Sequence, residues 1–82
     1  MLLAQQIRAA RSLLEWSQDD LALKAGIGVA TLRRLEAKPG PASGNAETGW
    51  KIQAALQEAG VIFIPADAQH GYGVRLAKSS AT

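Results

Sequence analysis

The chain has 82 residues, a formal net charge of +2 and no cysteine. A chain this short forms one small domain with a modest core, and the lack of cysteine excludes disulfides and a cysteine-bound zinc ion, so oligomerisation is the remaining stabilising device. No apolar run approaches ~18 residues, and residues 1–16 lack the charged-then-apolar order of a signal peptide, so we expect a cytoplasmic protein without a membrane span.

The first expected element is an amphipathic helix over residues 2–14. Its apolar positions Leu3, Ile7, Ala10 and Leu14 follow one another at spacings of four, three and four residues. This is the period of a helix that buries one face.

A second helix is expected over residues 18–25. Ser17 is a favourable N-cap, because its hydroxyl can accept a hydrogen bond from the backbone N–H of Asp20 while the Asp20 carboxylate reaches back. Gly26 then ends the helix, since glycine is favoured just after a helix C-terminus.

A third helix is expected over residues 29–37, after a tight glycine turn. Leu32 and Leu35 give it an apolar stripe, and Pro39 prevents a long continuation. Two short helices joined by such a turn are typical of a helix-turn-helix, whose second helix enters the major groove of DNA.

The rest of the chain predicts one further helix and a hairpin. Residues 38–44 are rich in proline and glycine and form a loop, after which Asn45 can cap a fourth helix that Gly60 ends. The run VIFI at residues 61–64 and the alternating run at residues 72–76 predict two β-strands.

The predicted fold class is therefore mainly α, with about four helices and a C-terminal β-hairpin. We expect a helix-turn-helix bundle over residues 1–60, a hairpin over residues 61–76 and a disordered tail at residues 77–82. Residues 1–38 hold six Lys/Arg and four Asp/Glu, whereas the remainder holds three of each. The whole positive excess lies in the half that carries the motif, as expected for a nucleic-acid-binding surface, although such an excess also serves solubility.

A distinctive set of residues repeats a known pattern across residues 1–38. These are Arg11, Ser17, Gln18, Leu21, Ala22, Ala25, Gly26, Ile27, Thr31, Leu32, Arg34, Leu35 and Glu36. The pattern resembles the Cro/repressor-type (XRE-like) helix-turn-helix regulators. The resemblance implies a domain that binds double-stranded DNA. The chain departs from the family at Gly28, Val29 and Ala30, where polar residues are usual.

The expected DNA-binding residues are Gln18, Val29, Ala30, Thr31, Arg33, Arg34 and Lys38. Arg34 is a candidate base reader because its guanidinium matches O6 and N7 of guanine, with a phosphate contact or a solvated position as alternatives. Arg33 is equally suited to a phosphate or a base. Thr31 can contact either or serve as a cap. Val29 and Ala30 can touch a thymine methyl group or simply permit close approach.

The resemblance also assigns roles outside the third helix. Gln18 matches a family position whose side chain and backbone N–H bind a phosphate, which suits a helix N-terminus. Arg11 and Glu36 match a structural pair that joins the first helix to the end of the third. The loop after the third helix, flanked by Lys38, Asn45, Thr48 and Lys51, follows the DNA backbone in the family.

The hairpin is the second informative feature. Val61, Ile62, Phe63 and Ile64 are apolar on both faces of the strand, a lone two-stranded hairpin is marginal in water, and an apolar edge favours pairing with another chain. We therefore expect these residues to form a homodimer interface, the alternative being a hairpin that folds only onto its own helices.

Catalysis has no support in the sequence, and we expect no enzyme activity, cofactor or metal. His70 is a lone histidine in a glycine-rich turn, without a second ligand nearby. Two functions remain open. The first is a sequence-specific, dimeric DNA-binding regulator, most simply a repressor. The second is a protein-interaction module, such as the antitoxin component of a toxin–antitoxin pair, which binds a toxin.

Overall fold

The computed structural model describes residues 2–42 and 45–78. In these residues the chain forms the helices α1 (Ala4–Leu14), α2 (Gln18–Ala25), α3 (Val29–Glu36) and α4 (Ala46–Glu58), followed by the strands β1 (Val61–Ile64) and β2 (Gly73–Leu76). The predicted fold class, a small helical bundle with a C-terminal hairpin, is confirmed. None of the helices in the described residues is long and apolar enough to cross a membrane.

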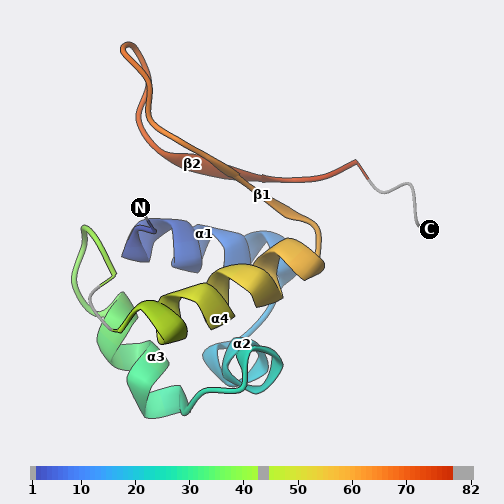
Figure 1. Cartoon of the computed structure of the whole chain (residues 1–82). Coiled ribbons are helices and arrows are strands. Elements are labelled where there is room, and N and C mark those ends of the chain that lie inside the picture. The colour runs from blue at the N-terminus through green and yellow to red at the C-terminus, as the bar shows by residue number, and fades with distance from the viewer. Residues whose placement is uncertain (1, 43–44, 79–82) are drawn as a thin grey trace.

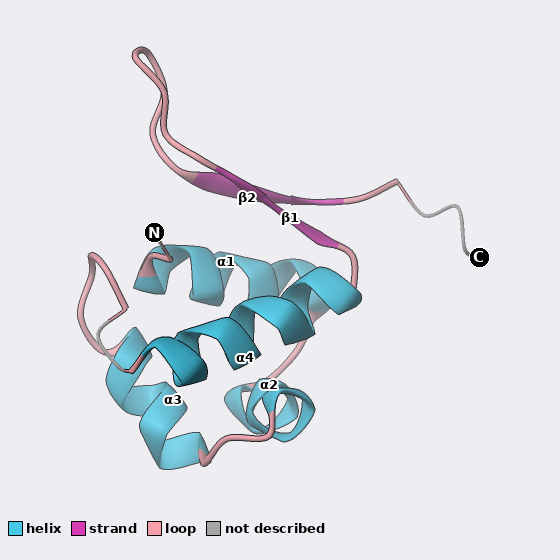
Figure 2. Cartoon of the chain, viewed as in Figure 1, coloured by secondary structure: helices cyan, strands magenta, loops and turns pink. Residues whose placement is uncertain are grey.

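The elements form two groups around α1 and α4. Figure 1 shows the hairpin lying across α1 and α4, while α2 and α3 lie on the other side of the bundle. The turn of the hairpin projects away from the helices, as the view coloured by secondary structure also shows (Figure 2). The helix-turn-helix and the hairpin are therefore separate surfaces of one small domain.

The core contains large side chains from every helix. Each predicted helix has an apolar stripe, and the stripes meet at a common centre. The largest fully buried side chains are those of Ile7, Leu21, Leu32, Ile52 and Leu56.

Three boundaries differ from the predicted ones. Helix α1 begins at Ala4 rather than at residue 2, because Leu3 instead forms a β-bridge with Pro41. Helix α3 ends one residue earlier and β2 begins one residue later than predicted. Residues 43–44 of the predicted loop and residues 79–82 of the predicted tail lie outside the described residues.

The caps of α2 and α4 form as expected. The N–H of Asp20 donates to the Ser17 hydroxyl at 3.0 Å, and the N–H of Ser17 donates to the Asp20 carboxylate at 2.9 Å. The pKa of Asp20 is lowered, because the backbone N–H of Ser17 and, to a smaller extent, the Ser17 hydroxyl donate to its charged carboxylate. At α4, the Asn45 side chain accepts from the N–H of Thr48 at 2.7 Å. Each cap satisfies a backbone donor that the helix itself leaves free.

A buried glutamine, which the sequence did not single out, attaches the hairpin to α1. Gln6 is only 4% exposed. Its side-chain oxygen accepts from the N–H of Leu3 at 2.9 Å, and its side-chain nitrogen donates to the carbonyl of Gly73 at 3.0 Å. One amide therefore satisfies a helix N-terminus and holds the start of β2.

Gly49 provides a test of the helical packing. It lies inside α4, and a Cβ built on it meets nothing within 4 Å. Because glycine loses more backbone entropy than alanine in a helix, Gly49→Ala should stabilise the protein by roughly 0.5–1 kcal/mol. Thermal denaturation followed by circular dichroism should show a melting temperature raised by a few degrees; a lowered value would contradict the position of α4.

Candidate nucleic-acid interface

The segment from α2 to α3 has the geometry of a helix-turn-helix. Gly26 follows α2 with φ +71°, a left-handed conformation that glycine adopts without strain. The N–H of Ile27 then donates back to the carbonyl of Ala22 at 3.0 Å. Gly28 caps the start of α3 without a side-chain hydrogen bond. Three residues therefore reverse the chain between two helices of eight residues each.

The solvent-exposed face of helix α3 carries the small side chain of Ala30 and the long, charged side chain of Arg34. Leu32, Leu35 and Glu36 are buried, whereas Ala30, Arg33 and Arg34 are exposed and Val29 and Thr31 are half-buried. Ala30 and Arg34 are four residues apart and therefore lie one above the other on the helix. Because helical side chains lean toward the N-terminus, the guanidinium of Arg34 can extend over the small methyl group of Ala30.

A buried ion pair holds the C-terminal end of α3. The Arg11 guanidinium donates from Nε to Oε2 of Glu36 at 2.9 Å and from Nη2 to Oε1 at 2.7 Å. The Glu36 side chain is only 3% exposed. The planar fork of arginine fits a carboxylate in this two-point manner, so the pair fixes the direction of α3 relative to α1 as well as its distance.

Two further side chains complete this cluster around Glu36. The side-chain amide of Gln18 donates to Oε1 of Glu36 at 3.1 Å. The guanidinium of Arg8 donates to the Glu36 carbonyl at 2.6 Å and so satisfies an acceptor at the C-terminus of α3. The amide of Gln18, expected at a phosphate, is thus engaged within the protein, whereas its backbone N–H lies in the first turn of α2.

Sequence reasoning did not identify Arg8. A local signal exists, because Arg8 precedes Arg11 by three residues and the two share one region of the α1 surface. Its partner is a backbone carbonyl 28 residues away. No residue type marks such an acceptor in a sequence.

The residues around the loop after α3 lie at the surface. Lys38 is exposed. On α4, the Lys51 ammonium lies 3.3 Å from the Glu47 carboxylate one turn earlier, and the two side chains are 38% and 74% exposed. An exposed pair of this kind contributes little to stability and is easily exchanged for another anion.

The residues predicted for dimerisation lie on the hairpin, away from α2 and α3. Val61 is buried and Phe63 packs against the core, whereas Ile62 and Ile64 remain 45% and 37% exposed. In the turn beyond them, His70 and Asp67 approach at 3.2 Å, and the pKa of Asp67 is lowered because its carboxylate accepts from two backbone N–H groups.

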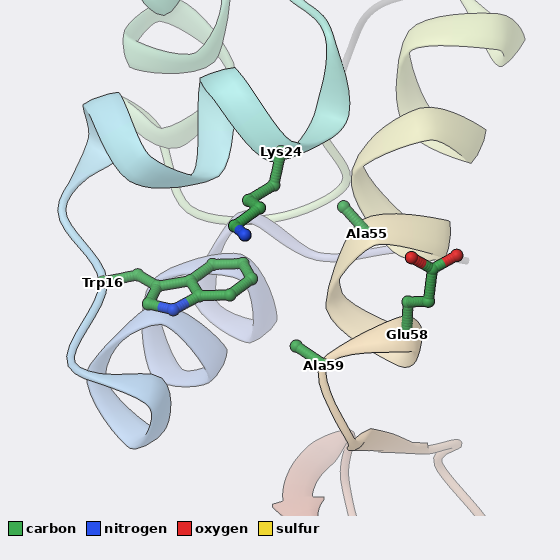
Figure 3. A pocket seen from close by; sticks show the side chains of 5 residues that line it. All are labelled: Trp16, Lys24, Ala55, Glu58 and Ala59. Atoms are coloured by element: carbon green, nitrogen blue, oxygen red, sulfur yellow. The ribbon is translucent and has the colours of Figure 1, made fainter.

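Trp16 lines a shallow groove between α2 and the end of α4 (Figure 3). The Lys24 ammonium stands 6.0 Å from the centre of the indole, and Ala55, Ala59 and Glu58 form the opposite wall. The groove measures about 160 Å³, which is below the about 300–1,000 Å³ typical of small-molecule sites. Trp16 also packs against the core.

Glu36→Ala should strongly destabilise the protein. It leaves the Arg11 guanidinium partly buried without its partner, and breaking a buried pair from one side costs roughly 3–5 kcal/mol. Chemical denaturation measures the change in the free energy of unfolding. Glu47→Ala is the matched control, since it removes the exposed partner of Lys51 and should cost at most about 0.5 kcal/mol. Equal losses in the two variants would show that the buried pair does not hold α3.

A family model described as helix-turn-helix matches residues 7–57 of the chain. No curated protein matches significantly. The matched residues begin within α1, contain all of α2 and α3, and end one residue before the end of α4. They therefore include the glycine turn, the exposed face of α3 and the Arg11–Glu36 pair. Because the match spans more than half of the chain, the protein belongs to the Cro/repressor-type (XRE) helix-turn-helix proteins, a family of DNA-binding regulators.

Proposed function

We propose that this protein is a sequence-specific transcriptional repressor without enzyme activity, and that α3 enters the major groove of its operator. The observation that carries the proposal is the exposed face of α3, which includes Ala30, Arg33 and Arg34. On the buried side of the same helix, Glu36 is bound to Arg11 of α1. A rigidly held helix with exposed donors is what base recognition requires, because a loosely held one loses orientation entropy on binding.

Base reading and phosphate contact are divided among different residues in this proposal. Arg34 lies at the centre of the exposed face and reads a guanine through its two parallel donors. Ala30, and Val29 beside it, approach the methyl group of a neighbouring thymine. Arg33, Thr31 and Lys38, together with the backbone N–H at the start of α2, contact phosphates and position the helix. Because Val29 and Ala30 at the start of α3 cannot form side-chain hydrogen bonds, Arg34 makes most of the hydrogen bonds to bases in this proposal.

The proposed active form is a homodimer joined through the hairpin. A single short helix reads too few base pairs for a unique operator, and two copies related by a two-fold axis read a pseudo-palindrome. The hairpin packs on α1 and α4 and leaves Ile62 and Ile64 exposed, so this surface stays accessible while α3 occupies DNA. A dimer bound at a promoter excludes the transcription machinery by occupying the site.

DNA binding should depend steeply on salt. Phosphate contacts release condensed counterions, so the logarithm of the affinity falls linearly with the logarithm of the salt concentration. Fluorescence anisotropy with labelled duplexes from about 50 to 200 mM salt measures the slope. Absence of binding at the low end, or a slope near zero, would reject the proposed function.

Arg34 and Arg33 should respond differently to substitution. Duplexes selected from a random pool with the wild-type protein provide the specific site. Arg34→Ala should then cost roughly 1–3 kcal/mol on that site and little on random DNA, because it removes a base contact. Arg33→Ala should weaken both by similar factors and reduce the salt slope by about one. If Arg34→Ala also weakened both DNAs equally, Arg34 would be a phosphate contact and another residue would read the base.

A further inference from the structure

The register of the hairpin determines which backbone groups face outward from each strand. Ile62 is opposite Arg75, and Ile64 is opposite Gly73. Just before β1, the N–H of Ala77 donates to the carbonyl of Gly60 at 2.7 Å. In an antiparallel ladder the hydrogen-bonded pairs alternate with pairs that are not hydrogen-bonded. Starting from Ala77 and Gly60, the pairs that bond within the hairpin are therefore Ile62 with Arg75 and Ile64 with Gly73.

Pro65 supports the same assignment. If Ile64 and Gly73 were instead a pair without mutual hydrogen bonds, one of the flanking bonds would need an N–H on Pro65, which proline lacks. The backbone N–H and C=O groups of Val61 and Phe63 consequently point away from β2. On the other strand, the groups of Val74 and Leu76 point away from β1. In the described residues the sheet has only these two strands, so both edges offer such groups to another chain.

Charge distinguishes the two edges. On β2, a two-fold axis midway between the outward-facing residues Val74 and Leu76 places Arg75 directly opposite Arg75 of the second copy, and like charges at opposed positions are destabilising. The same operation on β1 places Ile62 opposite Ile62 of the second copy. Ile62 is 45% exposed in the single chain, so this contact removes apolar surface from water.

We propose that two copies of the chain associate through β1, which pairs antiparallel with β1 of the second copy so that Ile62 meets its counterpart on the two-fold axis. This deepens, and rests on, the homodimer of the proposed function. In this register Val61 exchanges two hydrogen bonds with Phe63 of the second copy, and symmetry supplies two more. The result is a four-stranded sheet with β2 at each edge.

Neighbouring two-fold registers leave one of the free carbonyls of β1 without a hydrogen-bond donor. A shift in one direction places Val61 opposite Pro65 of the second copy, which has no N–H to donate. A shift in the other direction pairs Phe63 with Ala59, whose N–H already donates to carbonyls of α4. Only the register centred on Ile62 therefore gives a partner to every outward-facing backbone N–H and C=O group of Val61 and Phe63.

The surface beside β1 suits an added strand. Since β1 packs on α4 and β2 on α1, the outer edge of β1 is on the α4 side. Gln53 of α4 and Phe63 of β1 share the lining of an open groove of about 180 Å³ that also extends to Gln6 of α1 and to Tyr72. On α4 the helical neighbours of Gln53 are Trp50, which is 70% exposed, and Gln57. In the proposed dimer, a second β1 extends the sheet on this side of the molecule, next to α4.

Cysteine cross-linking tests the register directly, because the natural chain contains no cysteine. Opposed residues of a pair that is not hydrogen-bonded have Cα atoms about 4.5 Å apart, within the about 4.4–6.8 Å range of disulfides. Ile62→Cys should therefore form a covalent dimer under mild oxidation, seen on a non-reducing gel and reversed by reductant. Arg75→Cys is the matched control, because it occupies the same face and the same ladder position on β2, and it should remain mostly uncross-linked. Both positions are exposed, and circular dichroism verifies that the variants fold.

The outcomes separate this proposal from the proposed function. Efficient cross-linking of Ile62→Cys alone supports the β1 register. Cross-linking of Arg75→Cys alone, or of neither variant, would overturn it, even where light scattering finds a wild-type dimer. A wild-type chain that is a monomer at tens of micromolar would overturn both the register and the homodimer. None of these results decides whether the chain binds DNA, which the salt titration measures without reference to the hairpin.

Discussion

The position of α3, the helix proposed to face DNA, depends on one buried contact, the pair between the Glu36 carboxylate and the Arg11 guanidinium. Helix α3 has eight residues, too few to be stable by its own propensity in water. Leu32 and Leu35 anchor it by apolar burial, but burial alone is non-directional. The two-point contact at 2.9 and 2.7 Å adds direction, and the Arg8 contact to the Glu36 carbonyl fixes the same end of the helix. The contacts of Glu36 at the C-terminal end of α3 therefore determine which face of this helix is exposed.

Helix α1 connects the two surfaces of the molecule. Arg8 and Arg11 on one part of its surface hold α3, whereas Gln6 donates to Gly73 at the start of β2. At its N-terminus, the N–H of Ala4 also donates to the carbonyl of Gly40 in the segment after α3. A displacement of the hairpin therefore acts on the same helix that positions α3. In the proposed dimer, this connection through α1 sets the spacing between the two α3 helices.

The parts of the structure that follow from short-range chemistry were predictable from the sequence. The reciprocal cap of Ser17 and Asp20, the glycine turn at Gly26 and the apolar stripe of α3 all depend on neighbours within a few residues. The long-range contacts were less accessible. The bridge between Leu3 and Pro41, which delays the start of α1, joins two stretches with no distinctive side chains. The Arg11–Glu36 contact was accessible only through the family resemblance, because spacing alone does not indicate that residues 25 positions apart meet.

The side chain of Gln18 illustrates the same limit at the candidate site. Its type and position at a helix N-terminus are compatible with a phosphate contact, yet its amide donates to Glu36 in the free protein. The geometry around Glu36 decides this, since the buried carboxylate accepts hydrogen bonds on both oxygens and a nearby amide supplies one of them. The same cluster thus links α1, the first residue of α2 and the last residue of α3.

The proposed dimer couples the marginal stability of a small domain to its recognition of DNA. A two-stranded sheet is barely stable alone, and four strands over a helical layer exceed that limit. If β1 pairs between copies, association stabilises the folded state by mass action as well as bringing two α3 helices into register on DNA. Operator occupancy then rises more steeply with protein concentration than for a monomer, because dimer formation precedes tight binding. In the proposed dimer, the exposed isoleucines of β1 give a small domain both a larger core and a concentration-dependent response.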